Sequence, residues 1–242
     1  MNPINLSQST TQIMPVNHPN DLPAVLTALS LEKRRPTLVL VGGASKLSPG
    51  DFEKVETLFL KVLAPLAQEL GLAVVDGGTD AGIMRLIGQA RKTIGGTFPL
   101  IGVAPLGLVN LPNQPALSGD SAPLEEHHTH CLLIPGDQWG DESPWIATVA
   151  STLASGLPST AILINGGEVT WKDAQSNVEV KRKVVVVDGS GRTADILADA
   201  IAGYEVSDQR ARPLVDSGFL NSLDLNQSVE HLTAQIRQFF TT

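Results

Sequence analysis

Short apolar runs that end at glycine recur along this chain. Residues 37–41, 72–75, 160–164 and 184–187 form four such runs, and a Gly-Gly pair or a Gly-Ser-Gly turn follows each within two residues. Continuous apolar runs of this length are typical of strands that are buried on both faces of a parallel sheet. Longer stretches, such as residues 51–70, carry apolar residues at helical spacing. This alternation of strand and helix predicts a doubly wound parallel sheet.

The same patterns predict the extent of each element. Six strands are expected, at residues 37–41, 72–75, 99–105, 130–134, 160–164 and 183–187. Helices are expected at residues 22–31, 51–70, 82–92, 142–155, 193–202 and 228–240. The fold class is therefore α/β, a three-layer α/β/α sandwich with a mostly parallel sheet of about six strands.

The chain divides into three parts. Residues 1–35 are predicted to form an N-terminal arm with a short helix, and the polar residues 1–20 to be a loose arm. Residues 36–204 are predicted to form the layered domain. Residues 205–242 are predicted to be a C-terminal helical extension that covers a sheet edge or meets another subunit.

Composition excludes several classes of protein. The 242 residues are 42% hydrophobic and only 17% charged, which suits a buried sheet and argues against disorder. The net charge of −8 disfavours general binding to nucleic acid or to anionic membranes. No apolar run approaches a membrane span, and the amino terminus lacks the features of a secretory signal, so a cytoplasmic location is expected. The single cysteine, Cys131, is expected to be a buried strand thiol.

The glycine turns are the candidate binding elements. They all follow strands, so they are expected along one carboxyl edge of the sheet, where open α/β sheets bind ligands. Glycine lets backbone amides approach a ligand, and a helix N-terminus beside the turn favours anions. Each turn alone is equally well explained as a simple tight connection, but four of them in one chain favour a binding site. The candidates in these turns are Gly42, Gly43, Ala44, Gly77, Gly78, Thr79, Gly82, Gly166, Gly167, Gly189, Ser190, Gly191 and Arg192.

Arg192 is the sharpest of these candidates. It lies two residues after Ser190 at the start of a predicted helix. A guanidinium beside free backbone amides would pair bidentately with a phosphate. An ordinary exposed arginine is the alternative.

Three histidines, His127, His128 and His130, precede or begin a predicted strand. Histidine is a common metal ligand, but no cysteine or carboxylate at a recognised spacing completes a set, so no metal site is predicted. Histidines that line the ligand cleft are the preferred interpretation, with His130 as the candidate contact.

Several motifs together resemble a known family. They are VGGAS (41–45), VVDGGTDAGIM (74–84), IGVAP (101–105), LEEHHTHCLLI (124–134), ILINGG (162–167) and VVVVDGSGRTADILA (184–198). In this order they resemble the amino-terminal cytosolic domain of melastatin-type TRP channels. They are more closely similar to free-standing prokaryotic relatives of that domain in the SLOG superfamily.

The resemblance implies a Rossmann-like fold that binds ADP-ribose or a related NAD-derived nucleotide across the glycine turns, with no cofactor required. Channel members that bind ADP-ribose have a Tyr and an Arg where this chain has Glu142 and Val149. The expected partner is a small-molecule nucleotide, and a homo-oligomer is weakly favoured because related sheets commonly pair through helices.

The same superfamily supplies an enzymatic alternative. The Lonely Guy phosphoribohydrolases cleave the N-glycosidic bond of nucleotides with a PGGxGTxxE motif. This chain reads NGGEVTWKDA at the corresponding junction, so Glu168 and Asp173 are its nearest carboxylates but neither stands at the position of the motif glutamate. We therefore expect a nucleotide-sensing module first and a nucleotide N-glycosidase second. DNA binding, known elsewhere in the superfamily, is disfavoured by the charge.

Overall fold

The computed structural model describes residues 11–43, 45–111 and 117–241. Within these residues one parallel sheet contains eight strands in the order β1-β7-β4-β3-β2-β8-β9-β10. They are β1 (Gln12–Pro15), β2 (Thr37–Gly42), β3 (Ala73–Asp76), β4 (Leu100–Pro105), β7 (His130–Ile134), β8 (Ser159–Ile164), β9 (Lys183–Asp188) and β10 (Leu220–Asp224). A separate short pair joins β5 (Val109–Asn110) to β6 (Ala122–Pro123).

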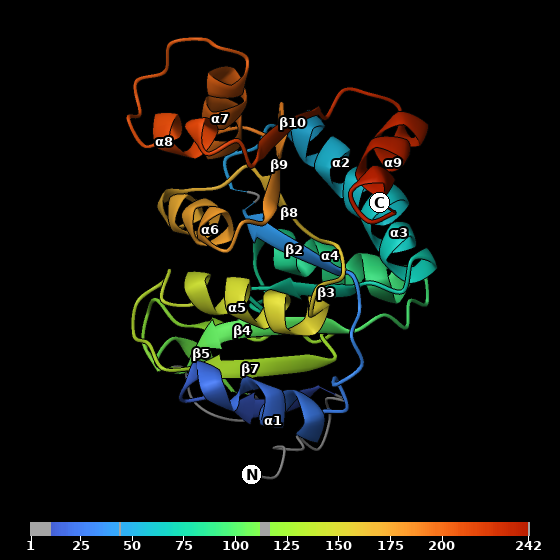
Figure 1. Cartoon of the computed structure of the whole chain (residues 1–242), viewed down its shortest axis with the longest axis vertical. Helices are drawn as coiled ribbons and strands as arrows, with labels where there is room; N and C mark the ends of the chain where they lie inside the picture. Colours follow the sequence, from blue (N-terminus) through green and yellow to red (C-terminus); the bar gives the residue numbers. More distant parts are fainter. Residues whose placement is uncertain (1–10, 44, 112–116, 242) are drawn as a thin grey trace.

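Helices cover both faces of this sheet. One face packs against α1 (Leu22–Ala28), α5 (Ser143–Ala154), α6 (Glu168–Glu179), α7 (Thr193–Ile201) and α8 (Ala211–Asp216). The other packs against α2 (Pro49–Leu58), α3 (Ala64–Glu69), α4 (Gly82–Thr93) and α9 (Val229–Gln238). Figure 1 shows α1 beside β7, with α7, α8 and α9 around β9 and β10. The three-layer α/β/α prediction is confirmed. None of the helices described here has the length and apolar character needed to cross a bilayer.

The apolar runs are continuous because each strand supplies both cores. In β2, Leu38 and Leu40 pack on the α2–α4 side, whereas Val39 and Val41 pack on the α5–α7 side. Successive side chains of a strand point to opposite faces, so a sheet covered on both sides needs apolar residues at every position.

The long helix predicted at residues 51–70 forms with one irregularity. A π-helical turn, Phe59–Leu63, lies between α2 and α3. Pro65 follows in α3 and has no N–H to donate within the helix. A π turn widens the backbone just before the proline, which explains why the apolar face continues across a residue that usually interrupts helices.

All six predicted strands are confirmed, with each end within one residue of the expected position. Two more strands, β1 and β10, add one strand at each edge of the sheet. The expectation that residues 1–20 form a loose arm is therefore wrong for Gln12–Pro15, which pair in parallel with β7. Residues 1–10 lie outside the described part of the chain.

The connections reverse direction next to β2. From β2 the chain proceeds through β3 and β4 to β7 on one side, whereas β8, β9 and β10 follow on the other side. Loops from the carboxyl ends of β2 and β8 therefore turn to opposite faces of the sheet. This topological switch point is where open α/β sheets form a ligand crevice.

Candidate functional site

The carboxyl ends of β2, β8 and β9 bring three of the predicted turns together. Asn165 connects two of them, because its backbone N–H donates to Ser190 Oγ at 2.8 Å and its Nδ2 donates to the Ser190 carbonyl at 2.8 Å. The Gly43 N–H donates to the Ile164 carbonyl at 3.0 Å, which ties in the turn after β2. We refer to the edge of the sheet bordered by these three turns as the switch-point crevice, after the place where open α/β sheets bind ligands.

Gly42 and Gly43 end β2 at this crevice. Gly42 has φ +119°, and a Cβ there would lie 2.0 Å from the Ile164 carbonyl oxygen. A Cβ on Gly43 would meet only Asn165 Oδ1, at 3.8 Å. Gly42 is thus required by the backbone, whereas Gly43 leaves open space toward the crevice. Ala44, the next predicted contact, lies outside the described residues.

Gly166 and Gly167 form the turn from β8 into α6. Gly166 has φ +100°, and a Cβ there would lie 2.5 Å from Thr170 Oγ1 in the first turn of the helix. The Gly167 N–H donates to Thr170 Oγ1 at 3.1 Å. A Cβ on Gly167 would lie 2.9 Å from Arg192 Nη2, so the guanidinium lies directly against this turn.

Arg192 joins the turn after β9 to the two others. It has φ +57°, an unusual value for a residue with a side chain, and its Nη1 donates to Ser45 Oγ at 2.7 Å. Among the described residues no carboxylate pairs with it. The guanidinium is exposed between residues 45 and 167, with donors left for an anion.

The turn at residues 188–192 is arranged differently from the expectation. Ser190 is buried, and its Oγ donates to the Val187 carbonyl at 2.6 Å. The N–H groups of Gly189 and Gly191 both donate to Asp195 Oδ1, at 3.0 and 2.9 Å. The amide cradle therefore already holds an anion, which is the carboxylate of α7 itself. A phosphate would bind these two amides only if Asp195 moved.

The turn after β3 lies one strand further along the edge. The strand β3 pairs in parallel with β2, and Val75, the residue before Asp76, lies opposite Val39. A Cβ on Gly78 would lie 2.7 Å from Gly102 Cα, so this turn folds down onto β4. Thr79 is buried and bridges Leu124. Gly77, Gly78, Thr79 and Gly82 therefore lie near the crevice without a described contact to its other turns.

His130 is not brought to the crevice. It is the first residue of β7 and therefore lies at the amino end of a parallel strand, opposite the glycine turns. Its Nδ1 lies 2.7 Å from Thr129 Oγ1, and its Nε2 faces the Leu29 carbonyl at 3.2 Å. Burial lowers its pKa. Among the described residues no group of three His, Cys, Asp or Glu side chains is placed to hold a metal ion.

Asn165 lies between the candidate turns, and sequence reasoning missed it. It is fully buried with φ +53°, and its Oδ1, on the Gly43 side of the turn, has no hydrogen-bond partner among the described residues. A buried unsatisfied acceptor in a native fold requires an explanation. The signal was present in the sequence, since Asn165 is the polar residue that closes the apolar run before Gly166.

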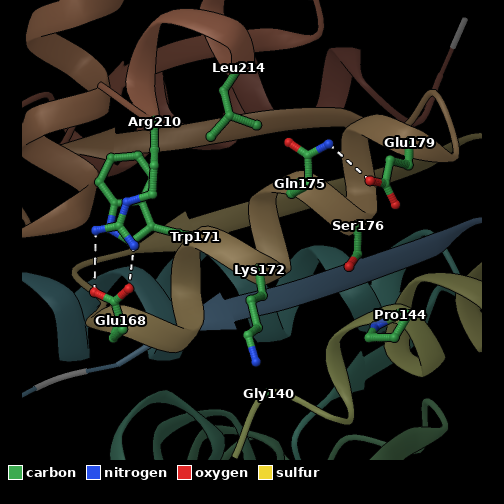
Figure 2. Close-up of a pocket in the computed structure, with 10 residues that line it drawn as sticks. All are labelled: Gly140, Pro144, Glu168, Trp171, Lys172, Gln175, Ser176, Glu179, Arg210 and Leu214. Carbon is green, nitrogen blue, oxygen red and sulfur yellow. Dashed lines mark hydrogen bonds and ion pairs between the residues drawn. The ribbon is translucent and has the colours of Figure 1, made fainter. Parts of the chain in front are cut away.

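A pocket of about 560 Å³ adjoins the crevice along α6. Figure 2 shows it between α6, the start of α5 and α8. The Arg210 guanidinium lies 4.6 Å from the centre of the Trp171 ring and pairs with Glu168 and Asp208. Lys172 points away from this cluster toward Gly140. Glu168 follows Gly167 directly, so the pocket begins next to the crevice.

Two buried acids lie behind this pocket. The Ser143 hydroxyl donates to Asp173 Oδ1 at 2.6 Å, and the Gly140 N–H donates to Glu142 Oε2 at 2.8 Å. Burial raises the pKa of Asp173 to about 7 and also raises the pKa of Glu142. Asp173 is therefore held between helices, while Glu168 is exposed and paired with Arg210. The two carboxylates considered for hydrolysis do not converge.

Sequence comparison identifies the family. A model of the family described as "SLOG in TRPM, prokaryote" matches residues 35–234. The chain belongs to this family of SLOG domains. The match covers all strands of the sheet except β1, and it confirms the resemblance carried by the glycine motifs.

Curated relatives of this SLOG domain are ion channels. The transient receptor potential cation channel subfamily M member 2 of Rattus norvegicus is 23% identical over 82% of this chain and 15% of the channel. Its counterpart in Mus musculus is 24% identical over 64% of this chain and 12% of the channel. The transient receptor potential cation channel subfamily M member-like 2 of Nematostella vectensis is 22% identical over 80% of this chain and 15% of that protein. The chain thus spans a small part of the length of these relatives.

Proposed function

We propose that this SLOG domain is a nucleotide-binding sensor module that recognises ADP-ribose or a related NAD-derived nucleotide at the switch-point crevice. One observation carries the proposal. Three glycine turns meet at the topological switch point, and an exposed arginine with no carboxylate partner among the described residues lies across them. Turns without side chains at the carboxyl edge of the sheet, together with a cation that has no carboxylate partner in the described part of the chain, suit a phosphorylated ligand.

The chemistry of the crevice divides between two kinds of ligand group. Arg192 and the start of α6 favour the negative charge of a phosphate. Asn165 Oδ1 offers an acceptor, which suits a hydroxyl or amino donor such as those of a ribose or a base. The relationship to the subfamily M member 2 channels supports a nucleotide of this class. Glu142, which stands where the ADP-ribose-binding channel members have a Tyr, is turned into the fold, where its carboxylate accepts the Gly140 N–H.

We further propose that the domain acts in the cytoplasm, requires no cofactor and has a small-molecule nucleotide as its partner, with self-association as a homo-oligomer. The single thiol, Cys131, is buried and has a pKa raised by burial to about 12, which suits a reducing compartment without requiring it.

The direct test is to incubate the protein with AMP, NAD and ADP-ribose and to measure both binding and products. The sensor proposal expects saturable binding of at least one phosphorylated nucleotide, with the nucleotide recovered intact. Release of a free base would instead identify an N-glycosidase. Lack of binding by all three compounds would reject the proposal.

Arg192→Ala should weaken binding of ADP-ribose by 10- to 150-fold. Removing a charge-assisted hydrogen bond typically costs about 1.5–3 kcal/mol, and Arg192 is the cation of the turn after β9 that lies against Gly167. Stability should change little because the side chain is exposed. Calorimetric titration and denaturant unfolding on the same preparation would measure both effects.

Arg212→Ala is the matched control. Arg212 is also exposed, lies on α8 and pairs with Asp216 at 3.0 Å, away from the crevice. Its loss should leave the affinity unchanged. Equal affinities of the Arg192 variant and the natural protein would remove Arg192 from the site.

A further inference from the structure

Four ionisable side chains form a buried network beneath α4. His128 Nε2 lies 2.8 Å from Asp76 Oδ1, and His128 Nδ1 lies 2.7 Å from Glu125 Oε2. Glu125 Oε1 in turn lies 2.6 Å from His127 Nδ1. Asp76, Glu125 and His128 are each no more than 2% exposed. Buried ionisable side chains thus connect the end of β3 to the segment before β7.

The geometry determines the charge of His128. Both of its ring nitrogens face carboxylate oxygens that already accept a backbone N–H, from Gly78 at 2.7 Å and from His127 at 2.9 Å. An ionised carboxylate can only accept, so both nitrogens must donate. Hydrogen bonds to His128 and His127 outweigh burial and lower the pKa of Glu125, so the arrangement fits an imidazolium at His128. Burial alone would lower its pKa, but Asp76 and Glu125 outweigh burial and raise the pKa to about 9.

Hydrogen bonds connect the network to the turn after β3. Asp76 Oδ1, which accepts from His128, also accepts the Gly78 N–H. The backbone N–H of Glu125 donates to the Gly78 carbonyl at 3.0 Å, and the Asp80 N–H donates to the Pro123 carbonyl at 2.8 Å. Thr79 and Leu124 form a β-bridge. Both sides of the turn are therefore held by residues 122–128.

Glycines make this close arrangement sterically feasible. A Cβ on Gly88 of α4 would lie 2.2 Å from the Glu125 carboxylate, so only glycine lets α4 pack over it. A Cβ on Gly102 of β4 would lie 2.5 Å from Gly78 Cα and 3.4 Å from the His128 ring. The space for both the ring and the turn exists because these positions lack side chains.

We propose that His128 is a positioning residue whose imidazolium, held between Asp76 and Glu125, fixes the glycine turn at residues 77–79 against the segment at residues 122–128. Burying three charges is expensive unless they are paired, and in some proteins such buried networks specify one conformation rather than add stability. Here the specified feature is the path of the turn.

The surrounding charges are consistent with this assignment. From α4, Arg91 Nη1 donates to the His127 carbonyl at 3.3 Å, and Arg91 and Arg85 both attract Glu125 electrostatically. On β7 the Cys131 thiol is neutral, because its pKa is raised to about 12, mainly by burial and to a smaller extent by electrostatic repulsion from Asp76. On the segment itself, His127 Nε2 lies 3.5 Å from Glu126 Oε1. None of these groups donates to Asp76.

Loss of the His128 proton has a defined effect on the network. A neutral imidazole donates from one nitrogen only, so either Asp76 or Glu125 would lose its hydrogen bond from His128 in a buried site and keep only its other donors. Asp76 already has one oxygen, Oδ2, without a described partner. The turn should therefore loosen as the pH rises through about 9.

Nuclear magnetic resonance of the ligand-free protein tests this directly. At pH 7 the ¹⁵N shifts of the His128 ring should report two protonated nitrogens. The Gly78 amide resonance should titrate with the same midpoint as the ring, near pH 9. In Glu125→Gln, which removes one of the two carboxylates, both midpoints should fall together by at least one pH unit.

Hydrogen exchange provides a second readout. His128→Gln should lower the protection of the amides at residues 77–79 at least tenfold more than it lowers the average protection of the sheet. Arg182→Gln is the matched control, since Arg182 is also buried and hydrogen-bonded, to Asn177 and Ser159, on the opposite face of the sheet. It should lower protection without this local excess.

A neutral His128 ring at pH 7 would overturn the inference. So would a Gly78 amide that does not follow the ring, or turn protection that falls equally in the two variants. The pH titration and Glu125→Gln keep the inference testable if His128→Gln does not fold. None of these measurements uses a nucleotide, so their outcome is independent of the proposed function.

Discussion

Gly42→Ala should lower the free energy of unfolding by roughly 2–6 kcal/mol, whereas Gly43→Ala should leave it nearly unchanged. Forcing a residue with a Cβ into the φ of +119° found at Gly42 costs about 1–3 kcal/mol. The Cβ would also lie 2.0 Å from the Ile164 carbonyl oxygen, and overpacking of this kind costs about 1–3 kcal/mol more. That oxygen belongs to the neighbouring central strand, which cannot move independently.

The neighbouring variant provides the control. A Cβ on Gly43 meets Asn165 Oδ1 at 3.8 Å, an ordinary contact, and no positive φ is required there. The proposed site predicts a separate effect, because that Cβ narrows the crevice and should weaken nucleotide binding in a normally stable protein. Denaturant unfolding of both variants measures the first difference. Equal stabilities would show that the turn after β2 relaxes more easily than its geometry indicates.

The central strands could be predicted because their apolar runs serve two cores at once. A residue such as Val39 or Leu40 has no solvent-facing alternative, so the run is continuous and bounded by glycine. The edge strands carry no such signal. β10 exposes Asn221 and Ser222, and β1 has four residues whose partner, β7, lies more than a hundred positions away. Their pairing is a tertiary effect that local sequence does not encode.

The candidate site was predictable at the level of turns and not of contacts. Glycine pairs after strands located the crevice, since all parallel strands end at one edge. The occupation of the amide cradle by Asp195 was not predictable, because it depends on how α7 leaves the turn. The place of His130 could have been predicted from the sequence, because the first residue of a parallel strand lies at the edge opposite the glycine turns.

The buried charges illustrate the same limit. His128 lies 52 residues from Asp76 in sequence, and nothing in the local pattern indicates that they meet. Glu142, the N-cap residue of α5, and Asp173 of α6 likewise come from separate elements that pack on one face of the sheet. Sequence reasoning assigned the histidines to a ligand cleft because polar side chains are usually exposed. Their burial follows from the packing of whole helices.

Asp173→Asn should stabilise the protein above neutral pH, by up to about 4 kcal/mol. Burial raises the pKa of Asp173 to about 7 from an ordinary value of 3.8, and the repulsion by Glu142 adds to it. A pKa raised by about 3 units corresponds to roughly 4 kcal/mol between the two protonation states. Asparagine has the same shape and keeps an acceptor for the Ser143 hydroxyl, which donates at 2.6 Å, but it cannot ionise.

The sign of the pH dependence follows from linkage. The folded protein binds the Asp173 proton more tightly than the unfolded chain does. The stabilisation of the fold by this tighter binding is therefore complete below pH 3.8 and is lost as the pH rises through about 7. The stability of Asp173→Asn relative to the natural protein should therefore rise from near zero at pH 4 to a plateau above pH 7. Urea unfolding across this range measures the difference. Asp137→Asn, which makes the same change at an exposed aspartate in the turn before α5, is the matched control. A flat profile for Asp173→Asn would mean that its carboxyl ionises normally between α5 and α6, contrary to the burial seen there.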